Sequence, residues 1–167
     1  DKLILHLCAD IGSDTKPYKD AGYHVMCLGK KYGVENFNVK EMGFAGNIYG
    51  IIANPPCTHF SIARTNAKTP RDLQEGMRLV KECLRIIWEC QYRIAKDTTK
   101  LSPLKFWALE NPYFGMLQWF IVKPALVFDR WEFGDNYQKR TALWGRFNEP
   151  KKNPVPMTTE AKTKAKT

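Results

Sequence analysis

A cysteine and a glutamate are the two residues of this sequence whose settings best suit reaction chemistry. Cys57 follows two prolines at the end of an apolar run, and Glu110 opens the sequence Glu-Asn-Pro at the end of another. A thiolate is a strong nucleophile, and a carboxyl group can move a proton beside it. Since Pro-Pro stiffens the exit of a strand, Cys57 is poorly suited to a core position. The alternatives are a packing role for Cys57, and a surface acid or helix cap for Glu110.

A turn that contains glycine follows the first apolar run, which spans Leu3 to Leu7. The turn consists of Ala9, Asp10, Ile11, Gly12 and Ser13. Backbone amides in such a turn can bind an anionic group, and glycine lets a ligand approach the backbone closely. Plain turn structure is the alternative, because glycine-containing turns after strands are common.

The strands and helices expected around these residues indicate an α/β protein. We expect strands over residues 3–7, 23–28, 49–53 and 106–110, with weaker candidates over 125–128 and 141–147. The clearest helix is expected to begin at Thr69-Pro70, with Thr69 as its cap and an apolar stripe from Leu73 to Ile94. Alternating strands and helices predict a mostly parallel sheet. Because such sheets bind ligands at the carboxyl ends of their strands, the turn, Cys57 and Glu110 are expected to meet there.

The composition fits one folded domain over residues 1–150 and a basic, disordered tail over residues 151–167. The formal net charge of +9 suits nucleic acid or a nucleotide as partner, and an ordinary basic surface is the alternative. Five cysteines without zinc-type spacing favour a reduced, cytoplasmic protein that needs no metal. No apolar run approaches the ~20 residues of a membrane span, so no membrane association is expected.

Taken in order, these pieces resemble motifs of the DNA cytosine-5 methyltransferase family, over residues 3 to about 147. The first turn and Ala21-Gly22-Tyr23 match the family's opening motif. Pro56-Cys57-Thr58-His59-Phe60-Ser61 matches its Pro-Cys loop. Glu110-Asn111-Pro112 matches its Glu-Asn-Val motif, and Gln138-Lys139-Arg140 partly matches its Gln-x-Arg motif.

The resemblance implies a Rossmann-like, S-adenosylmethionine-dependent methyltransferase fold and methyl transfer to carbon 5 of a cytosine. Cys57 would add to carbon 6 of the ring, Glu110 would protonate or hydrogen-bond nitrogen 3, and Arg140 would steady the base carbonyl or a phosphate. The first turn would hold the cofactor, S-adenosylmethionine, together with Asn54 and Pro55.

The sequence departs from the family's pattern in four places. His6 stands where the family has an acid, and Asp10 where it has a glycine. Gly29 and Lys30 follow the second strand, where the family places an acid for the cofactor's ribose, so weak cofactor binding is expected. The chain also has no room for the family's target-recognition segment. We therefore expect no tight, sequence-specific duplex binding, and either a partner subunit that supplies recognition or a base that is already accessible.

Two other functions fit parts of the sequence. Asn54-Pro55-Pro56 also resembles the motif of amino-group DNA methyltransferases, although these need an aromatic residue where Cys57 stands. A catalytically degenerate relative that only binds nucleic acid or a partner protein fits the altered turn, the missing acid and the basic tail.

Overall fold

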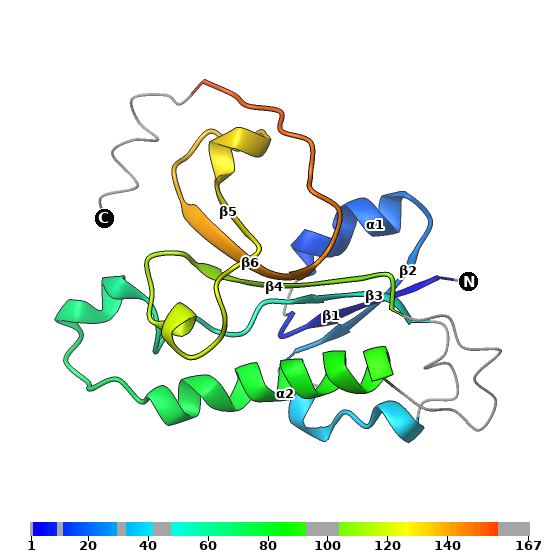
Figure 1. Ribbon diagram of the computed structural model, residues 1–167, viewed down its shortest axis with the longest axis horizontal. Coiled ribbons are helices and arrows are strands. Elements are labelled where there is room, and N and C mark those ends of the chain that lie inside the picture. Colours follow the sequence, from blue (N-terminus) through cyan, green and yellow to red (C-terminus); the bar gives the residue numbers. More distant parts are fainter. Residues whose placement is uncertain (1, 10–11, 30–32, 42–47, 93–103, 157–167) are drawn as a thin grey trace.

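One mixed sheet of six strands organises the described part of the chain in this computed structural model (Figure 1). The structure describes residues 2–9, 12–29, 33–41, 48–92 and 104–156. In sheet order the strands are β2 (His24–Leu28), β1 (Leu3–Leu7), β3 (Ile48–Ala53), β4 (Phe106–Pro112), β6 (Arg140–Arg146) and β5 (Leu126–Asp129). The first four are mutually parallel, whereas β6 is antiparallel to both β4 and β5. The predicted α/β class with a mostly parallel sheet is confirmed.

The path of the chain through the sheet changes direction beside β1. The chain pairs β1 with β2 on one side and then crosses to place β3 on the other. In open parallel sheets, a ligand crevice forms at the carboxyl ends of the strands where this reversal occurs. Leu7 and Ala53 end the two strands and pair with each other, so the first turn and Asn54 lie at this edge of the sheet.

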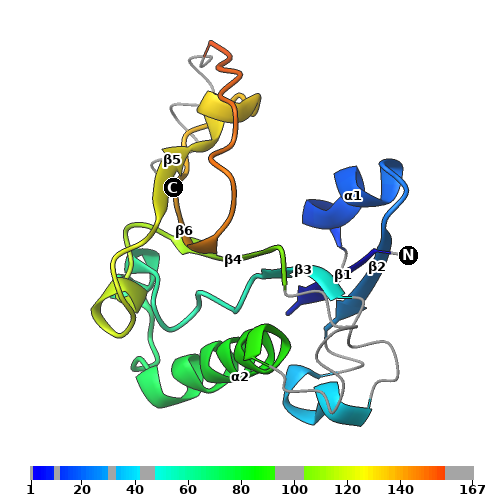
Figure 2. The same cartoon turned by 45° about the vertical axis from the view of Figure 1, so that its right-hand side comes forward.

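The two α-helices in the described part of the chain lie on opposite faces of the sheet (Figures 1 and 2). α2 (Leu73–Tyr92) runs along one face beside the short helices η2 (Val34–Asn36) and η3 (Val39–Glu41). α1 (Lys16–Asp20) lies on the other face. α2 is long but amphipathic, and no helix among the described residues is both long and apolar enough to cross a bilayer.

Asp72, rather than Thr69, caps α2. The backbone N–H of Glu75 donates to the Asp72 carboxylate at 2.9 Å, and the helix begins at the next residue, Leu73. Thr69 instead accepts a hydrogen bond from Arg64 through its hydroxyl oxygen at 2.6 Å. The prediction that the helix begins at Thr69 is therefore wrong, because a second capping residue lies nearer to the apolar stripe.

β4 separates the core from the opposite face of the sheet. Leu109 and Asn111 are buried, and Leu109 belongs to the core cluster that contains the buried stripe of α2. The alternate residues Phe106, Ala108 and Glu110 point the other way and line a pocket. On this second face, Tyr18 of α1 stacks on Phe106 at the start of β4, and β5 and β6 rise above the sheet (Figure 1).

The start of the expected tail lies against the short helix η8 (Arg130–Phe133). The backbone N–H groups of Asn153 and Val155 each donate at 2.9 Å, to the carbonyls of Glu132 and Trp131. Residues 151–156 are therefore placed, and the rest of the predicted tail lies outside the described residues.

Candidate functional site

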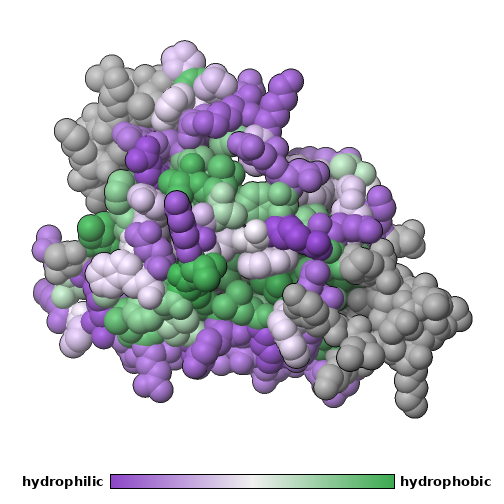
Figure 3. All heavy atoms as spheres, viewed as in Figure 1, coloured by the Kyte–Doolittle hydropathy of each residue, from purple (hydrophilic) through white to green (hydrophobic). Residues whose placement is uncertain are grey.

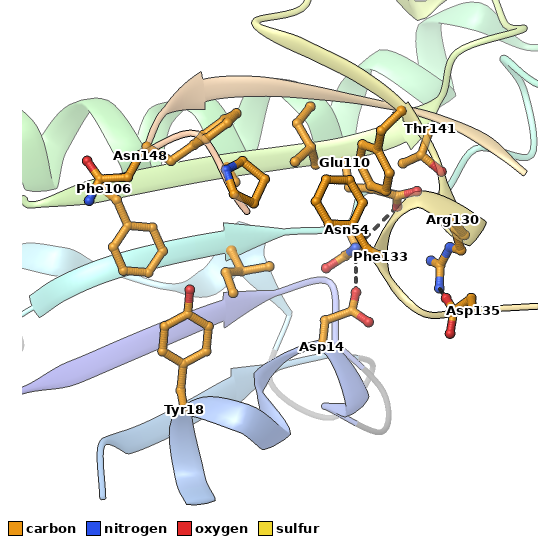
Figure 4. Close-up of a pocket in the computed structure, with 16 residues that line it drawn as sticks. Asp14, Tyr18, Asn54, Phe106, Glu110, Arg130, Phe133, Asp135, Thr141 and Asn148 are labelled. Atoms are coloured by element: carbon orange, nitrogen blue, oxygen red, sulfur yellow. Dashed lines mark hydrogen bonds and ion pairs between the residues drawn. The ribbon is translucent and has the colours of Figure 1, made fainter. Parts of the chain in front are cut away.

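Asn54 connects three elements at the carboxyl edge of the sheet (Figure 4). Its amide nitrogen donates to Asp14 Oδ2 at 3.0 Å and to Glu110 Oε2 at 3.2 Å. Its amide oxygen lies 2.8 Å from Nε2 of His6. Because the amide nitrogen already donates to two carboxylates, the oxygen must accept, and Nε2 of His6 is the donor to it. Asn54 thus holds its amide group in one orientation, between two acids.

His6 and Thr15 support this arrangement from beneath the first turn. Both side chains are buried, and Nδ1 of His6 lies 3.2 Å from the Thr15 hydroxyl. That hydroxyl also donates to the Gly12 carbonyl at 3.0 Å. Gly12 has a φ of 70°, and a Cβ there would lie 3.0 Å from the sulfur of Cys27. Glycine is therefore required at this position by the backbone angle and by the approach of β2.

The residues expected at the cofactor turn are only partly described. Ala9 is buried and donates its N–H to the Leu28 carbonyl at 3.0 Å, which joins the turn to β2. Ser13 is exposed at the start of η1 (Ser13–Thr15). Asp10 and Ile11 lie outside the described residues. The described part of the turn therefore lies at the expected strand end.

A pocket of about 390 Å³ opens beside Asn54, on the face of the sheet away from α2. This volume falls within the usual range for small-molecule sites. Its polar lining comprises Asp14, Asn54, Glu110, Arg130, Asp135, Thr141 and Asn148. Its apolar lining comprises Tyr18, Ile52, Phe106, Ala108, Phe128, Phe133, Leu143, Phe147 and Pro150. One end can therefore bind polar groups, while the other offers aromatic faces.

Glu110 leaves one carboxyl oxygen available in this pocket. Oε2 accepts from Asn54, whereas Oε1 is buried and has no hydrogen-bond partner among the described residues. A buried carboxyl oxygen without a partner is costly, typically about 1–3 kcal/mol or more. A ligand with an N–H or O–H group would relieve that cost. Oε1 is therefore the clearest unsatisfied acceptor beside the pocket.

Arg130 supplies the pocket with a positive charge that the sequence analysis did not single out. Burial alone would lower the pKa of Arg130, but nearby Tyr137, Glu110 and two aspartates outweigh burial and raise that pKa. The guanidinium lies 3.5 Å from Asp135, and its Nε is buried without a partner among the described residues. An arginine between an aspartate and a tryptophan matches no motif, so no sequence signal pointed to it.

Cys57 lies in the loop that leaves β3, next to β4. The Asn111 side chain donates to the Pro55 carbonyl at 3.0 Å, which ties this loop to β4. The Cys57 carbonyl accepts the N–H groups of Phe60 and Ser61 at 2.9 and 2.8 Å, and Phe60 is fully buried. Cys57 itself is half-buried and is not among the residues that line the pocket. The loop is thus anchored on both sides of the thiol.

Arg140 is already engaged by protein groups. Its guanidinium donates to the carboxylate of the buried Asp129 at 3.0 Å and lies 6.0 Å from the ring centroid of Phe114. It begins β6 next to Thr141, which lines the pocket, but Arg140 itself does not. The structure therefore groups Asn54, Asp14 and Glu110, with Cys57 on the adjoining loop and Arg140 at the pocket's margin.

Comparison with known proteins gives no family for the chain. No protein-family model matches it, and a search of curated proteins found no significant match.

Proposed function

We propose that the chain is the catalytic core of a cytosine-5 methyltransferase-like enzyme that acts through a covalent bond between Cys57 and the base. One observation carries the proposal, namely the 3.0 Å hydrogen bond from the Asn111 side chain to the Pro55 carbonyl. This bond joins Pro-Pro-Cys to Glu-Asn-Pro, the two motifs on which the resemblance chiefly rests. A thiol and a carboxyl group thereby leave adjacent strand ends of one sheet.

The order of the parallel strands supports a Rossmann-like methyltransferase fold. The chain changes direction between β1 and β3, and sheets of this kind bind nucleotide-like cofactors at the carboxyl ends of such strands. The first turn and Asn54 lie at those ends, where the Asn54 N–H donates to the Leu7 carbonyl at 3.0 Å. The antiparallel pair β5 and β6 then extends the sheet beyond β4 and closes the far side of the pocket.

The polar and aromatic side chains at this edge fit S-adenosylmethionine, which carries a sulfonium, an ammonium and ribose hydroxyls. The exposed Asp14 offers a carboxylate for its cation or hydroxyls, and Asn54 keeps that carboxylate in place at 3.0 Å. The stacked rings of Tyr18 and Phe106, 5.6 Å apart, offer an apolar wall for an adenine. When bound, the cofactor would supply the methyl group as an electrophile.

The side chains of this chain would prepare the base for that group. The Cys57 thiolate would form a bond to carbon 6, and the electrons of the 5,6 double bond would make carbon 5 nucleophilic. Glu110 would donate a proton or a hydrogen bond to nitrogen 3. After methylation, loss of the proton from carbon 5 would restore the double bond and expel the thiolate of Cys57.

Arg130 is our choice for the group that steadies the base carbonyl. It lines the same pocket as Glu110, whereas Arg140 is paired with Asp129. Nitrogen 3 and the neighbouring carbonyl of a cytosine are both acceptors, so a protonated Glu110 would donate to nitrogen 3 and the Arg130 guanidinium would donate to the carbonyl. Arg140 would then support the site indirectly, by holding Asp129 at the start of η8.

Trapping of the covalent bond tests the proposal directly. A single-stranded oligonucleotide containing 5-fluorocytosine cannot lose a proton from carbon 5, so the wild-type chain with S-adenosylmethionine should accumulate an adduct. Mass spectrometry of the digested protein should map that adduct to Cys57. Cys57→Ala should abolish it, whereas Cys90→Ser, a matched change on α2, should not. Methyl transfer by Cys57→Ala at a near-normal rate would show that the assignment is wrong.

A relative that only binds nucleic acid or a partner protein is the second candidate. It is favoured because the first turn already makes hydrogen bonds within itself that a cofactor would have to compete with. The Gly12 carbonyl already accepts both the Thr15 N–H, at 3.2 Å, and the Thr15 hydroxyl. Calorimetry with S-adenosylmethionine and with its demethylated product separates the two candidates. A measurable heat supports the enzyme, and no heat at millimolar ligand supports the binding-only relative.

A further inference from the structure

An exposed aromatic edge lies beside the two loops that carry the proposed catalytic groups. It consists of Phe114, Trp119 and Phe120, which are 55%, 72% and 45% exposed. All three belong to the segment that follows Glu-Asn-Pro, and Trp119 ends the short helix η7 (Leu117–Trp119). Apolar surface is visible over this segment in Figure 3. Large aromatic side chains so exposed indicate an interaction surface.

This edge is joined to the Cys57 loop by backbone contacts. Ser61 and Gly115 form an antiparallel bridge, and the N–H of Met116 donates to the Phe60 carbonyl at 3.0 Å. The ring of Phe120 packs on that of Phe60, with centroids 6.3 Å apart. The aromatic edge is therefore held at a set position relative to the proposed nucleophile.

The same two segments carry positive charge without acids. Residues 58–71 contain three basic and no acidic residues, and residues 112–128 contain one basic and no acidic residue. In the described part of the chain, the guanidinium groups of Arg64 and Arg71 bond only to neutral oxygens, those of Thr69, Pro70, His59 and Ser61. Lys123 is exposed. Their charges are thus available to an anionic partner.

We propose that the aromatic edge binds single-stranded nucleic acid, with bases beside the target stacked on Phe114 and Trp119 and phosphates on these cations. Unpaired bases offer free π-faces, which a duplex keeps within its stack. The core of a protein interface tends to exclude charge, so the interleaved cations favour nucleic acid over a protein partner. The inference rests on the proposed function, which supplies the target cytosine, and it adds that the substrate is single-stranded.

Binding without cofactor tests this inference apart from methyl transfer. Fluorescence anisotropy would compare a labelled 12-nucleotide single strand containing cytosine with the same sequence as a duplex. The single strand should bind more tightly to the full chain. Trp119→Ala and Phe114→Ala should each weaken that binding by about 5-fold or more, the scale of one lost stacking contact. Trp119→Phe, which keeps an aromatic face, should restore most of it.

Trp88 provides the matched control, because it is 63% exposed on α2 and lies outside the aromatic edge. Trp88→Ala should change the affinity by less than about twofold. Equal affinity for strand and duplex with no effect of Trp119→Ala would overturn the inference. A second result would also overturn it. If Trp119→Ala abolished self-association in sedimentation experiments but left the affinity for the single strand unchanged, the aromatic edge would be a contact between copies of the chain.

Failure of this inference can be told apart from failure of the proposed function. Aromatic-dependent strand binding with no adduct at Cys57 would leave the binding edge and remove the methyltransferase. If an adduct formed at Cys57 but neither aromatic substitution changed the affinity for the strand, the methyltransferase proposal would stand and the binding edge would be ruled out.

Discussion

Asn54 is the residue that allows two carboxylates to share one pocket. Asp14 and Glu110 would repel each other across a gap with no donor, but the Asn54 amide nitrogen donates to both. The His6 imidazole, buried beneath, holds the amide oxygen at 2.8 Å and prevents the amide from turning over. One carboxyl oxygen of Glu110 is left for a ligand, while the other is used to keep the side chain in place.

Replacement of Glu110 by glutamine tests the role of that free oxygen. The glutamine side chain keeps the shape and can still accept from Asn54, but it cannot supply a carboxyl proton to nitrogen 3. Methyl transfer by Glu110→Gln should therefore fall by about 100-fold or more, the usual scale for losing acid–base assistance. Single-turnover rates on a cytosine-containing strand would measure this loss.

The control for this substitution is Glu75→Gln, the same change at an exposed ion pair with Arg78 on α2. It should leave the single-turnover rate unchanged. An unaltered rate in Glu110→Gln, with the fold intact by circular dichroism, would reduce Glu110 to a structural residue.

The candidate site could be predicted from the sequence only where a residue type carries its own chemistry. Cys57 and Glu110 stand beside prolines at strand ends, so their positions followed from local pattern. Arg130 could not be predicted, because its place depends on how β5 and η8 are positioned around the pocket. The pairing of Arg140 with Asp129 was equally hidden, since it depends on the register between β5 and β6.

Strand pairing shows the same division among the elements. β1 and β3 are continuous apolar runs, because parallel strands in the middle of a sheet are buried on both faces, and both were predicted. The late strands were predicted as segments, but not the insertion of β6 between β4 and β5. The sequence pattern of a short strand predicts that the strand forms and which side chains lie on each face. Which strands it pairs with depends on the packing of the whole sheet.

Gly145 lies where β6 passes close to the backbone of β4. Its φ is 148°, and a Cβ there would lie 2.1 Å from the Trp107 carbonyl oxygen. Gly145→Ala should lower the free energy of unfolding by about 2 kcal/mol or more, because backbone strain and overpacking each cost about 1–3 kcal/mol. Urea denaturation would measure the change.

Gly33 serves as the control for that substitution, since its φ is −63° and a Cβ there would meet no atom within 4 Å. Gly33→Ala should be neutral or slightly stabilising. Equal stability of the two variants would show that β6 can move away from β4 at little cost.

Asp129 and Glu132 form a capping box at the start of η8, in which each side chain accepts the backbone N–H of the other residue, and this predicts an acid-dependent stability. Hydrogen bonds from Lys152 and from the Asp129 backbone lower the pKa of Glu132. A carboxyl with a depressed pKa in the folded state stabilises the fold above its unfolded pKa, about 4.3, and loses that contribution as pH falls through the folded value. The wild type should therefore exceed Glu132→Gln in stability at pH 7, and the difference should vanish on acidification.

Urea midpoints of both proteins between pH 3 and pH 7 would follow this difference. Lys152→Gln removes the first cause of the shift and should flatten the pH dependence. A difference between wild type and Glu132→Gln that is constant with pH would contradict the proposed linkage.

For the molecule as a whole, the net charge of +9 is expected to act through ion release rather than through sequence recognition. Affinity for single strands should fall linearly in log–log form with salt, by a slope of about 0.7 for each phosphate contacted. Lys123→Gln should remove about one phosphate contact and so reduce the slope by about 0.7. Lys16→Gln, at an ion pair with Asp20 on α1, should not change it.

Filter binding at rising salt, with random and defined sequences, would measure both slope and preference. We expect similar affinities for all sequences. One duplex bound about a thousand-fold better than the rest, the low end of true specificity, would contradict this expectation.

The placement of β6 also determines how the chain can fold while it is being made. β4 is translated before β6, so one side of this strand remains without a partner until residues 140–146 have emerged. An open strand edge is a template for pairing with other chains, and nascent polypeptides crowd together on polysomes. The pocket lies over the same strand, and its lining includes residues as late as Pro150. One edge of β4 is therefore unpaired during synthesis, and the site is complete only after residue 150 has been made. Slow translation between β4 and β6 would therefore favour aggregation of the nascent chain over formation of the site.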